Sequence, residues 1–176
     1  MKLLNERDGL VAGICNGFQA LIKLGLLPYG EIGVQEENSP TITFNKIGRH
    51  QSKLVRTKLC STRSPWLRKV SVGQILTVPI SHGEGRFVAS SNDIDTMLEN
   101  GQILTQYVDF EGNPNMDIQF NPNGSSMAIE GILSPDGRIL GKMGHSERIG
   151  EGLYKNVPGE FDLGLFESAV SYFRGE

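Results

Sequence analysis

The sequence has few cysteines, no marked excess of charge of one sign and no long apolar run. Its 176 residues include two cysteines, with 17 basic residues against 20 acidic ones and a net charge of -3. These charges are spread along the chain, so no basic patch predicts binding to nucleic acid or to an anionic membrane. No apolar stretch approaches the ~20 residues that span a bilayer, and residues 1–8 lack the apolar core of a signal peptide. We therefore expect a cytoplasmic protein with no nucleic-acid or membrane partner.

Motifs for phosphate and metal binding are also missing. Neither G-x-G-x-x-G nor G-x-x-x-x-G-K-[ST] occurs, and three scattered histidines with two distant cysteines match no zinc spacing. We therefore predict no metal site and no cofactor within this chain. Without export signals, Cys15 and Cys60 are expected to stay reduced, and we interpret Cys60 as a packing residue on a strand. There is no internal repeat or linker, which favours a single domain over residues 1–176.

The sequence Gly-Ile-Cys-Asn-Gly at residues 13–17 predicts a nucleophile on a sharp turn. The apolar run before it, residues 9–12, is typical of a strand buried on both faces, and residues 18–24 have the pattern of a helix. In the G-x-S-x-G elbow, the flanking glycines let the chain bend sharply and hold the middle side chain at the mouth of a sheet. Here that side chain is the thiol of Cys15. The alternative is a tight turn in which Cys15 is a small apolar filler, and the motif alone leaves both open.

The surroundings expected for Cys15 would support such chemistry. A helix N-terminus is expected to lower the pKa of the thiol, and the backbone amide of Asn16 would face an oxyanion formed there. His145 and Glu147, two residues apart, share a face if the chain there is extended. Glu147 could then hold one ring nitrogen of His145 while the other takes the proton from Cys15. Taken alone, a His-x-Glu sequence is more often a polar surface pair.

A third segment, residues 81–87, is expected to form a glycine-paired loop after a strand. Gly83 and Gly85 would let backbone groups there approach a ligand closely. We interpret His82 and Glu84 as residues that shape this loop rather than as an acid or base. Gln19, on the first turn of the helix after the elbow, could point its amide into the same pocket or be an ordinary polar helix residue.

These three segments together resemble the class I (Cys-His-Glu) glutamine amidotransferase domain of phosphoribosylformylglycinamidine synthase. Residues 13–19 look like the family's nucleophile segment, 81–87 like its glutamine-loop segment, and 121–125 with 143–148 like the run that leads to its His and Glu. The resemblance covers nearly the whole chain and implies an α/β fold, a flavodoxin-like sheet with flanking helices. It implies a catalytic triad and a set of glutamine-binding residues: Cys15, His145 and Glu147 for the first, and Asn16, Gln19, Gly83, Glu84 and Gly85 for the second.

The same resemblance implies a glutaminase half-reaction in purine biosynthesis. Cys15 would attack the side-chain amide of glutamine through a thioester, and the ammonia would pass to a synthetase region that amidates formylglycinamide ribonucleotide. That region, on the same longer chain or on a separate subunit, would hold the ATP and Mg. Two alternatives remain, a catalytically silent interaction fragment of that enzyme and another cysteine hydrolase on the same fold; Gln19 and the glycine segment argue against the latter.

Family members carry further strands and helices upstream of the nucleophile strand, with a glycine-rich loop that supplies the second oxyanion-hole amide. We therefore expect residues 1–176 to be a single partial domain, the C-terminal part, with the N-terminal part of the domain missing. Such a chain is expected to be a poor glutaminase alone, with an apolar, unpaired edge beside its first strand.

Weaker patterns predict the remaining elements. Alternating apolar residues predict strands, with Pro79 marking one of them as an edge strand or a strand end. The predicted strands lie near residues 41–44, 53–60, 75–80 and 103–110, a hairpin spans 127–133 and 138–144, and helices lie at 93–100 and 162–173. The last helix is expected to bury a stripe of Leu163, Phe166, Val170 and Phe173.

Overall fold

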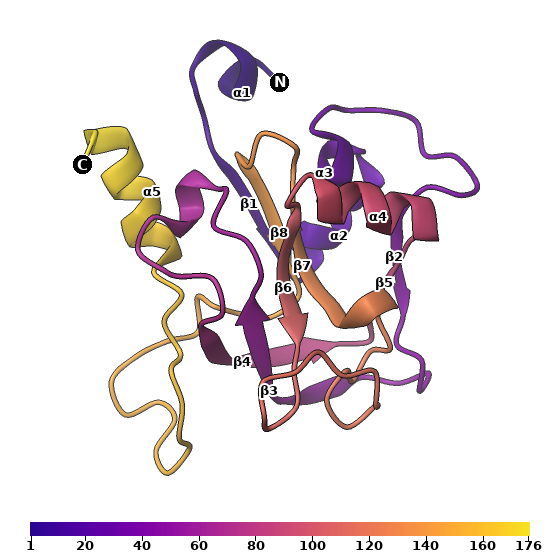
Figure 1. The fold of residues 1–176 in the computed structure, drawn as a ribbon, viewed down its shortest axis with the longest axis vertical. Helices are drawn as coiled ribbons and strands as arrows, with labels where there is room; N and C mark the ends of the chain where they lie inside the picture. Colours follow the sequence, from indigo (N-terminus) through magenta and orange to yellow (C-terminus); the bar gives the residue numbers. More distant parts are fainter.

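In the computed structural model, which describes residues 1–176, a six-stranded sheet carries helices on both faces (Figure 1). The strand order is β1-β8-β7-β6-β3-β4, and β2 and β5 form a separate antiparallel pair. The strands are β1 (Val11–Ile14), β2 (Thr41–Phe44), β3 (Gln51–Leu59), β4 (Ile75–His82), β5 (Glu84–Val88), β6 (Ile103–Tyr107), β7 (Ile129–Leu133) and β8 (Ile139–Lys142). The helices are α1 (Lys2–Glu6), α2 (Asn16–Lys23), α3 (Leu26–Tyr29), α4 (Ser91–Glu99) and α5 (Leu165–Arg174), with short 3-10 helices η1 (Pro65–Leu67) and η2 (Ser126–Ala128).

The two faces of the sheet bury separate cores, because successive side chains of a strand point to opposite faces. On β7, for example, Ile132 packs with α2, α3 and α4, whereas Leu133 packs with η1 and α5. Neither residue is exposed to solvent. Each face thus buries one half of every central strand, and this fixes the register of the sheet.

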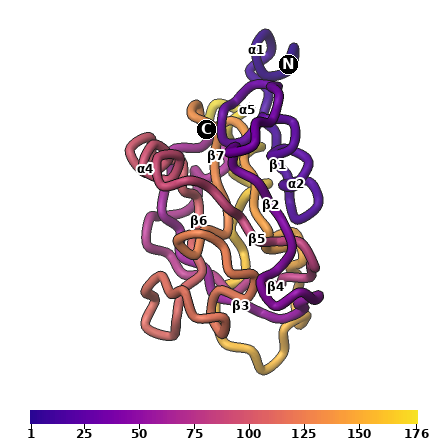
Figure 2. The backbone as a smooth tube through the Cα atoms, turned by 90° about the vertical axis from the view of Figure 1, so that its right-hand side faces the viewer, coloured from indigo at the N-terminus to yellow at the C-terminus, as the bar shows by residue number.

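The sheet is strongly curled, so its two ends approach each other. β1 and β8 are parallel, and every other neighbouring pair in this sheet is antiparallel. β3 and β4 bend across the lower ends of the other strands in Figure 1, and the tube in Figure 2 shows the same turn from the side. As a result β4, which is last in the strand order, meets the ends of β1 and β8, which are first.

Most of the predicted elements are present. The helix after residue 17 is α2, which buries Phe18, Leu21 and Ile22 as its spacing predicts. β4 is an edge strand, as Pro79 predicts, and the Asp-Gly hairpin joins β7 to β8. The α/β fold class is therefore confirmed. No helix of the chain is both long and apolar enough to cross a membrane.

Three expectations are wrong in detail. β1 is not buried on both faces, because it lies at the edge of the sheet with β8 as its only neighbour, and Ala12 is exposed. Residues 81–87 belong to two strands rather than to a loop, because β4 ends at His82 and β5 begins at Glu84, with only Gly83 between them. The distant strand β2 is the partner of β5.

The orientation of α5 also differs from the expectation. Phe166, Val170 and Phe173 are 50–62% exposed, whereas Leu165 and Ser168 are buried. Ser168 contributes a hydroxyl that accepts from the backbone N–H of Lys69 at 3.3 Å. The helix therefore packs Leu165 and Ser168 against η1 and the segment after it. Of the expected stripe, Leu163 is buried and the other three side chains lie outside.

Candidate functional site

Cys15 lies between β1 and α2 with φ 54° and ψ -107°, a backbone conformation that L-residues rarely adopt. The strain expected of an elbow thus falls on the cysteine itself, and neither flanking glycine has a positive φ. Gly13 has a different function, because a Cβ there would lie 2.7 Å from the backbone of Gly17. Gly13 lets the strand and the helix approach closely, whereas a Cβ at Gly17 would meet nothing within 4 Å.

The thiol of Cys15 is half-buried and donates to the carbonyl oxygen of Ser81 at 3.7 Å. Burial raises its pKa above the usual value, although the backbone N–H of Asn16 and the charge of Arg148 act in the opposite direction. The first N–H of α2 thus lowers this pKa as expected, but burial outweighs it, so the expected net lowering of the pKa is wrong. The backbone N–H of Asn16 therefore favours the thiolate form of Cys15.

His145 and Glu147 form the pair that their spacing predicts. The Nδ1 atom of His145 lies 2.6 Å from Oε1 of Glu147. Because a carboxylate only accepts, Nδ1 carries the hydrogen and Nε2 carries the lone pair of the neutral ring. Nε2 is buried and has no partner in the chain.

The topology brings Cys15 and the His145 pair to the same end of the sheet. β1 and β8 are parallel neighbours, Cys15 follows β1 directly, and its N–H donates to the carbonyl of Lys142 at 2.8 Å. Edge strand β4 contacts both: the backbone N–H of His145 donates to the carbonyl of Pro79, two residues from Ser81. The thiol and Nε2 of His145 are not hydrogen-bonded to each other; the thiol is bonded to Ser81 instead.

Three of the predicted substrate-binding residues are already hydrogen-bonded within the chain. The side-chain N–H of Gln19 donates to the carbonyl of Glu84, so the first turn of α2 is tied to β5 beside the elbow. Gly85 uses both backbone groups within the chain: its N–H donates to Asn45, and its carbonyl accepts from Asn123. The sequence predicted that the backbone of Gly85 would be open to a ligand. Both of its backbone groups are instead used within the chain.

His82 lies beneath this segment as a buried, neutral ring. Its Nδ1 atom lies 3.0 Å from Oδ1 of Asn45, whose amide nitrogen donates to two carbonyls. Oδ1 must therefore accept, which places the hydrogen on Nδ1 of His82 and leaves the buried Nε2 without a partner. Burial lowers the pKa of His82 to about 4, against the opposite effect of Glu130. A Cβ at Gly85 would lie 2.3 Å from this ring, so Gly85 is needed for packing.

Sequence reasoning missed a buried ion pair beneath the His145 loop. Nζ of Lys142 lies 3.2 Å from Oε1 of Glu130, and the two side chains are 1% and 0% exposed. The available signal was a charged residue inside each strand of an apolar hairpin, since Glu130 interrupts the apolar residues of β7 and Lys142 ends β8.

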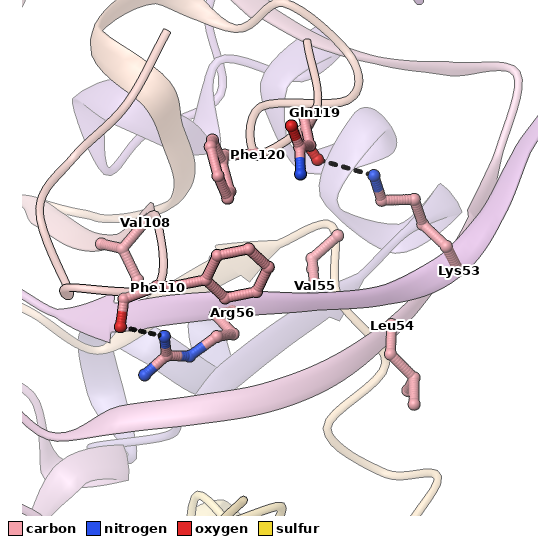
Figure 3. Close-up of a pocket in the computed structure, with 8 residues that line it drawn as sticks. All are labelled: Lys53, Leu54, Val55, Arg56, Val108, Phe110, Gln119 and Phe120. Carbon is pink, nitrogen blue, oxygen red and sulfur yellow. Dashed lines mark hydrogen bonds between the residues drawn. The ribbon is translucent and has the colours of Figure 1, made fainter. Parts of the chain in front are cut away.

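A separate cavity of about 200 Å³ lies between β3 and the loop after β6 and contains none of the predicted site residues (Figure 3). The rings of Phe110 and Phe120 close it on one side, and Lys53 reaches across to donate to the carbonyl of Gln119 at 2.7 Å. No group of three or more His, Cys, Asp or Glu side chains in the chain is arranged to hold a metal ion.

The class of protein that these features define is an α/β protein with a cysteine on a strained strand-to-helix elbow beside a hydrogen-bonded His-Glu pair. Residues 1–173 match the family described as the CobB/CobQ-like glutamine amidotransferase domain, and the chain belongs to this family.

Individual relatives give the same result. The chain is 37% identical over 161 residues to phosphoribosylformylglycinamidine synthase subunit PurQ of Synechococcus elongatus. The matched region covers 92% of this chain and 62% of the relative. It is also 37% identical over 146 residues to the same subunit of Aquifex aeolicus, covering 83% of this chain and 59% of the relative. The solved structure of PurLQS from Thermotoga maritima is similar with a TM-score of 0.69 and 27% identity, over 98% of this chain and 65% of that chain.

The chain thus spans less than two thirds of the length of these relatives. The resemblance stated from residues 13–19, 81–87 and 143–148 is confirmed at the level of the family and of these relatives.

Proposed function

We propose that this chain carries the glutaminase site of a phosphoribosylformylglycinamidine synthase, with Cys15 as nucleophile, His145 as acid and base, and Glu147 as the group that orients His145. The observation that supports this most strongly is the strained Cys15 elbow on β1 beside the hydrogen-bonded His145–Glu147 pair after the parallel strand β8.

The reaction begins with transfer of the thiol proton of Cys15 to Nε2 of His145, whose lone pair is free. The sulfur then attacks the side-chain amide carbon of glutamine, and the oxyanion that forms accepts from the N–H of Asn16. As the C–N bond breaks, His145 returns the proton to the leaving nitrogen, and ammonia departs from a thioester. Water, deprotonated by His145, attacks the thioester, and glutamate leaves as the thiol of Cys15 is regenerated.

Glutamine is placed between the first turn of α2 and the β4–β5 segment. The bond from Gln19 to the carbonyl of Glu84 fixes the distance between these two walls. Gly83 and the carboxylate of Glu84 are then the groups that meet the polar ends of the substrate, while Gly85 contributes by packing against His82. Asn16 serves through its amide.

The ammonia passes to a synthetase partner, which holds the ATP and Mg of the amidation. The support is the relatives' name, a subunit of phosphoribosylformylglycinamidine synthase, and the PurLQS assembly named for the similar structure. The expected location is the cytoplasm. In this proposal, residues 1–176 contribute the cysteine chemistry and the partner contributes the ligase chemistry.

The test is ammonia release from glutamine, measured with the chain alone and with the synthetase subunit added. Cys15→Ala is expected to abolish release, and Cys60→Ala, which removes the other thiol, is expected to preserve it. Equal release by Cys15→Ala and the unchanged chain would contradict the proposal. No release by the unchanged chain with the partner present would favour the silent interaction fragment instead.

A further inference from the structure

The loop that carries His145 rests on the buried Glu130–Lys142 pair. Lys142 donates through Nζ to the carbonyl of Gly144 and to the hydroxyl of Ser146, each at 3.0 Å. Glu130 accepts through Oε1 from the backbone N–H of Gly144. The pair therefore holds the residue on each side of His145.

Both charged groups are fully satisfied. An ammonium has three donors, and those of Lys142 go to Glu130, Gly144 and Ser146. The carboxylate of Glu130 receives Lys142, the N–H of Gly144 and, on its second oxygen, the hydroxyl of Thr105. A buried polar network in which every member is paired is rigid, because breaking any bond leaves an unpaired buried group.

Stability alone does not explain this pair. Replacing a buried ion pair by apolar residues of similar volume is often neutral or stabilising, because the charges lose their hydration when they are buried. Apart from the bond to Thr105 and the ion pair itself, every side-chain hydrogen bond of Glu130 and Lys142 goes to the two residues that flank His145. This direction of the bonds indicates that the pair fixes the loop.

We propose that Glu130 and Lys142 are positioning residues that hold the His145 ring in the orientation needed for proton transfer with Cys15. The inference rests on the proposed function for its effect on turnover. Its effect on the His145 ring can be measured without turnover. Lys142 bonds both the carbonyl of Gly144, before His145, and the hydroxyl of Ser146, after it. These two bonds fix the backbone conformation of the segment that carries His145.

The experiment uses the double variant Glu130→Gln/Lys142→Met, which removes both charges and keeps both volumes, so that neither leaves an unpaired buried charge. The matched control is Lys53→Met, which makes the same substitution at a lysine that donates to the carbonyl of Gln119, at the separate cavity of Figure 3. Thermal unfolding identifies any loss of folding. The first readout is the ¹⁵N shift of the histidine rings, since the chain has only three histidines. The second is kcat and KM for glutamine.

In the unchanged chain we expect His145 as a single tautomer with hydrogen on Nδ1, and in the double variant a mixture of tautomers. His82, whose Nδ1 hydrogen is held by Asn45, keeps its tautomer in both and serves as the internal control. We expect kcat to fall by ~10²-fold, the cost of a small misplacement, with KM changed little and with unfolding close to that of the unchanged chain. Lys53→Met should match the unchanged chain in every readout.

A single, unchanged His145 tautomer in the folded double variant would overturn the proposal, and so would an unchanged kcat. A failure of the unchanged chain to hydrolyse glutamine with the synthetase subunit present would contradict the proposed function only, because the ring signal is read without substrate.

Discussion

Cys15 combines two properties at the scale of a single residue: a strained backbone and a thiol whose pKa is raised by burial. Strain of this kind costs about 1–3 kcal/mol and persists only where neighbouring structure enforces it. The neighbours here are the close contact of Gly13 with α2 and the bond from the N–H of Cys15 to Lys142. The thiol of Cys15 is therefore held in position in its protonated form, and the proposed reaction needs His145 to take its proton.

The first prediction concerns the pH dependence of thiol labelling. Only the thiolate reacts, so the rate at which a small neutral alkylating agent labels Cys15 should rise about tenfold per pH unit and keep rising beyond the usual pKa of ~8.5. The measurement uses Cys60→Ala, because Cys60 is also a free thiol. A rate that levels off below pH 8 would show that the helix N-terminus outweighs burial.

A second prediction at this scale concerns His82 and acid stability. Its pKa is about 4 in the folded chain and 6.5 in the unfolded one, so between these values only the unfolded chain binds the proton. The contribution is fully present above pH 6.5 and is lost as the pH falls towards 4, by about 3 kcal/mol. The free energy of unfolding, measured from pH 7 to 4, should fall less steeply for His82→Gln than for the exposed control His50→Gln. Equal slopes would contradict this account.

At the scale of elements, the sequence predicted best where a pattern is local. The 3.6-residue spacing of α2, the Asp-Gly turn between β7 and β8, and Pro79 on an edge strand all depend on neighbouring residues. The sequence-based prediction failed where the structure of a segment depends on a partner far away in the sequence. β5 is a strand because it pairs with β2. Glu130 is tolerated inside an apolar strand because Lys142, on the neighbouring strand β8, pairs with it. The elbow at Cys15 and the pairing of His145 with Glu147 could be predicted from their motifs. For the ion pair beneath them, the sequence offered only a charged residue in each strand of an apolar hairpin, because the contact depends on how β7 and β8 pair.

The two glycines of the elbow provide a matched test of the packing between β1 and α2. Gly13→Ala should lower the free energy of unfolding by about 1–3 kcal/mol, because its Cβ would meet the backbone of Gly17 at 2.7 Å. Gly17→Ala should raise it by about 0.5–1 kcal/mol, because the site is open and alanine favours the helix. Chemical denaturation measures both. Similar effects of the two changes would mean that the elbow does not depend on this close contact.

The orientation of α5 is tested by a second pair. Leu165→Ala should cost about 2–5 kcal/mol because the side chain is buried, whereas Phe166→Ala should change stability by no more than about 0.5 kcal/mol because that ring is 56% exposed. Thermal or chemical unfolding of the two variants decides. If Phe166→Ala is the more destabilising of the two, α5 buries Phe166 as the sequence pattern predicted, and the orientation with Phe166 outside is wrong.

At the scale of the whole molecule, the curl of the sheet assembles the site. β1 and β4 are opposite edges in strand order, yet Ser81 on β4 contacts the thiol that follows β1, and Pro79 contacts the backbone of His145. The site therefore draws on segments from residue 15 to residue 147. No short part of the chain contains it, and any change that opens the curl should separate Cys15 from His145.

The central claim is that this curl makes Cys15 a nucleophile directed at glutamine. It is tested most directly by treating the chain with a glutamine-mimicking electrophile and mapping the adduct by mass spectrometry. The account predicts a single adduct on Cys15 that excess glutamine suppresses, with Cys60 unlabelled. Labelling of Cys60 in preference to Cys15, or labelling of Cys15 that glutamine does not slow, would contradict it.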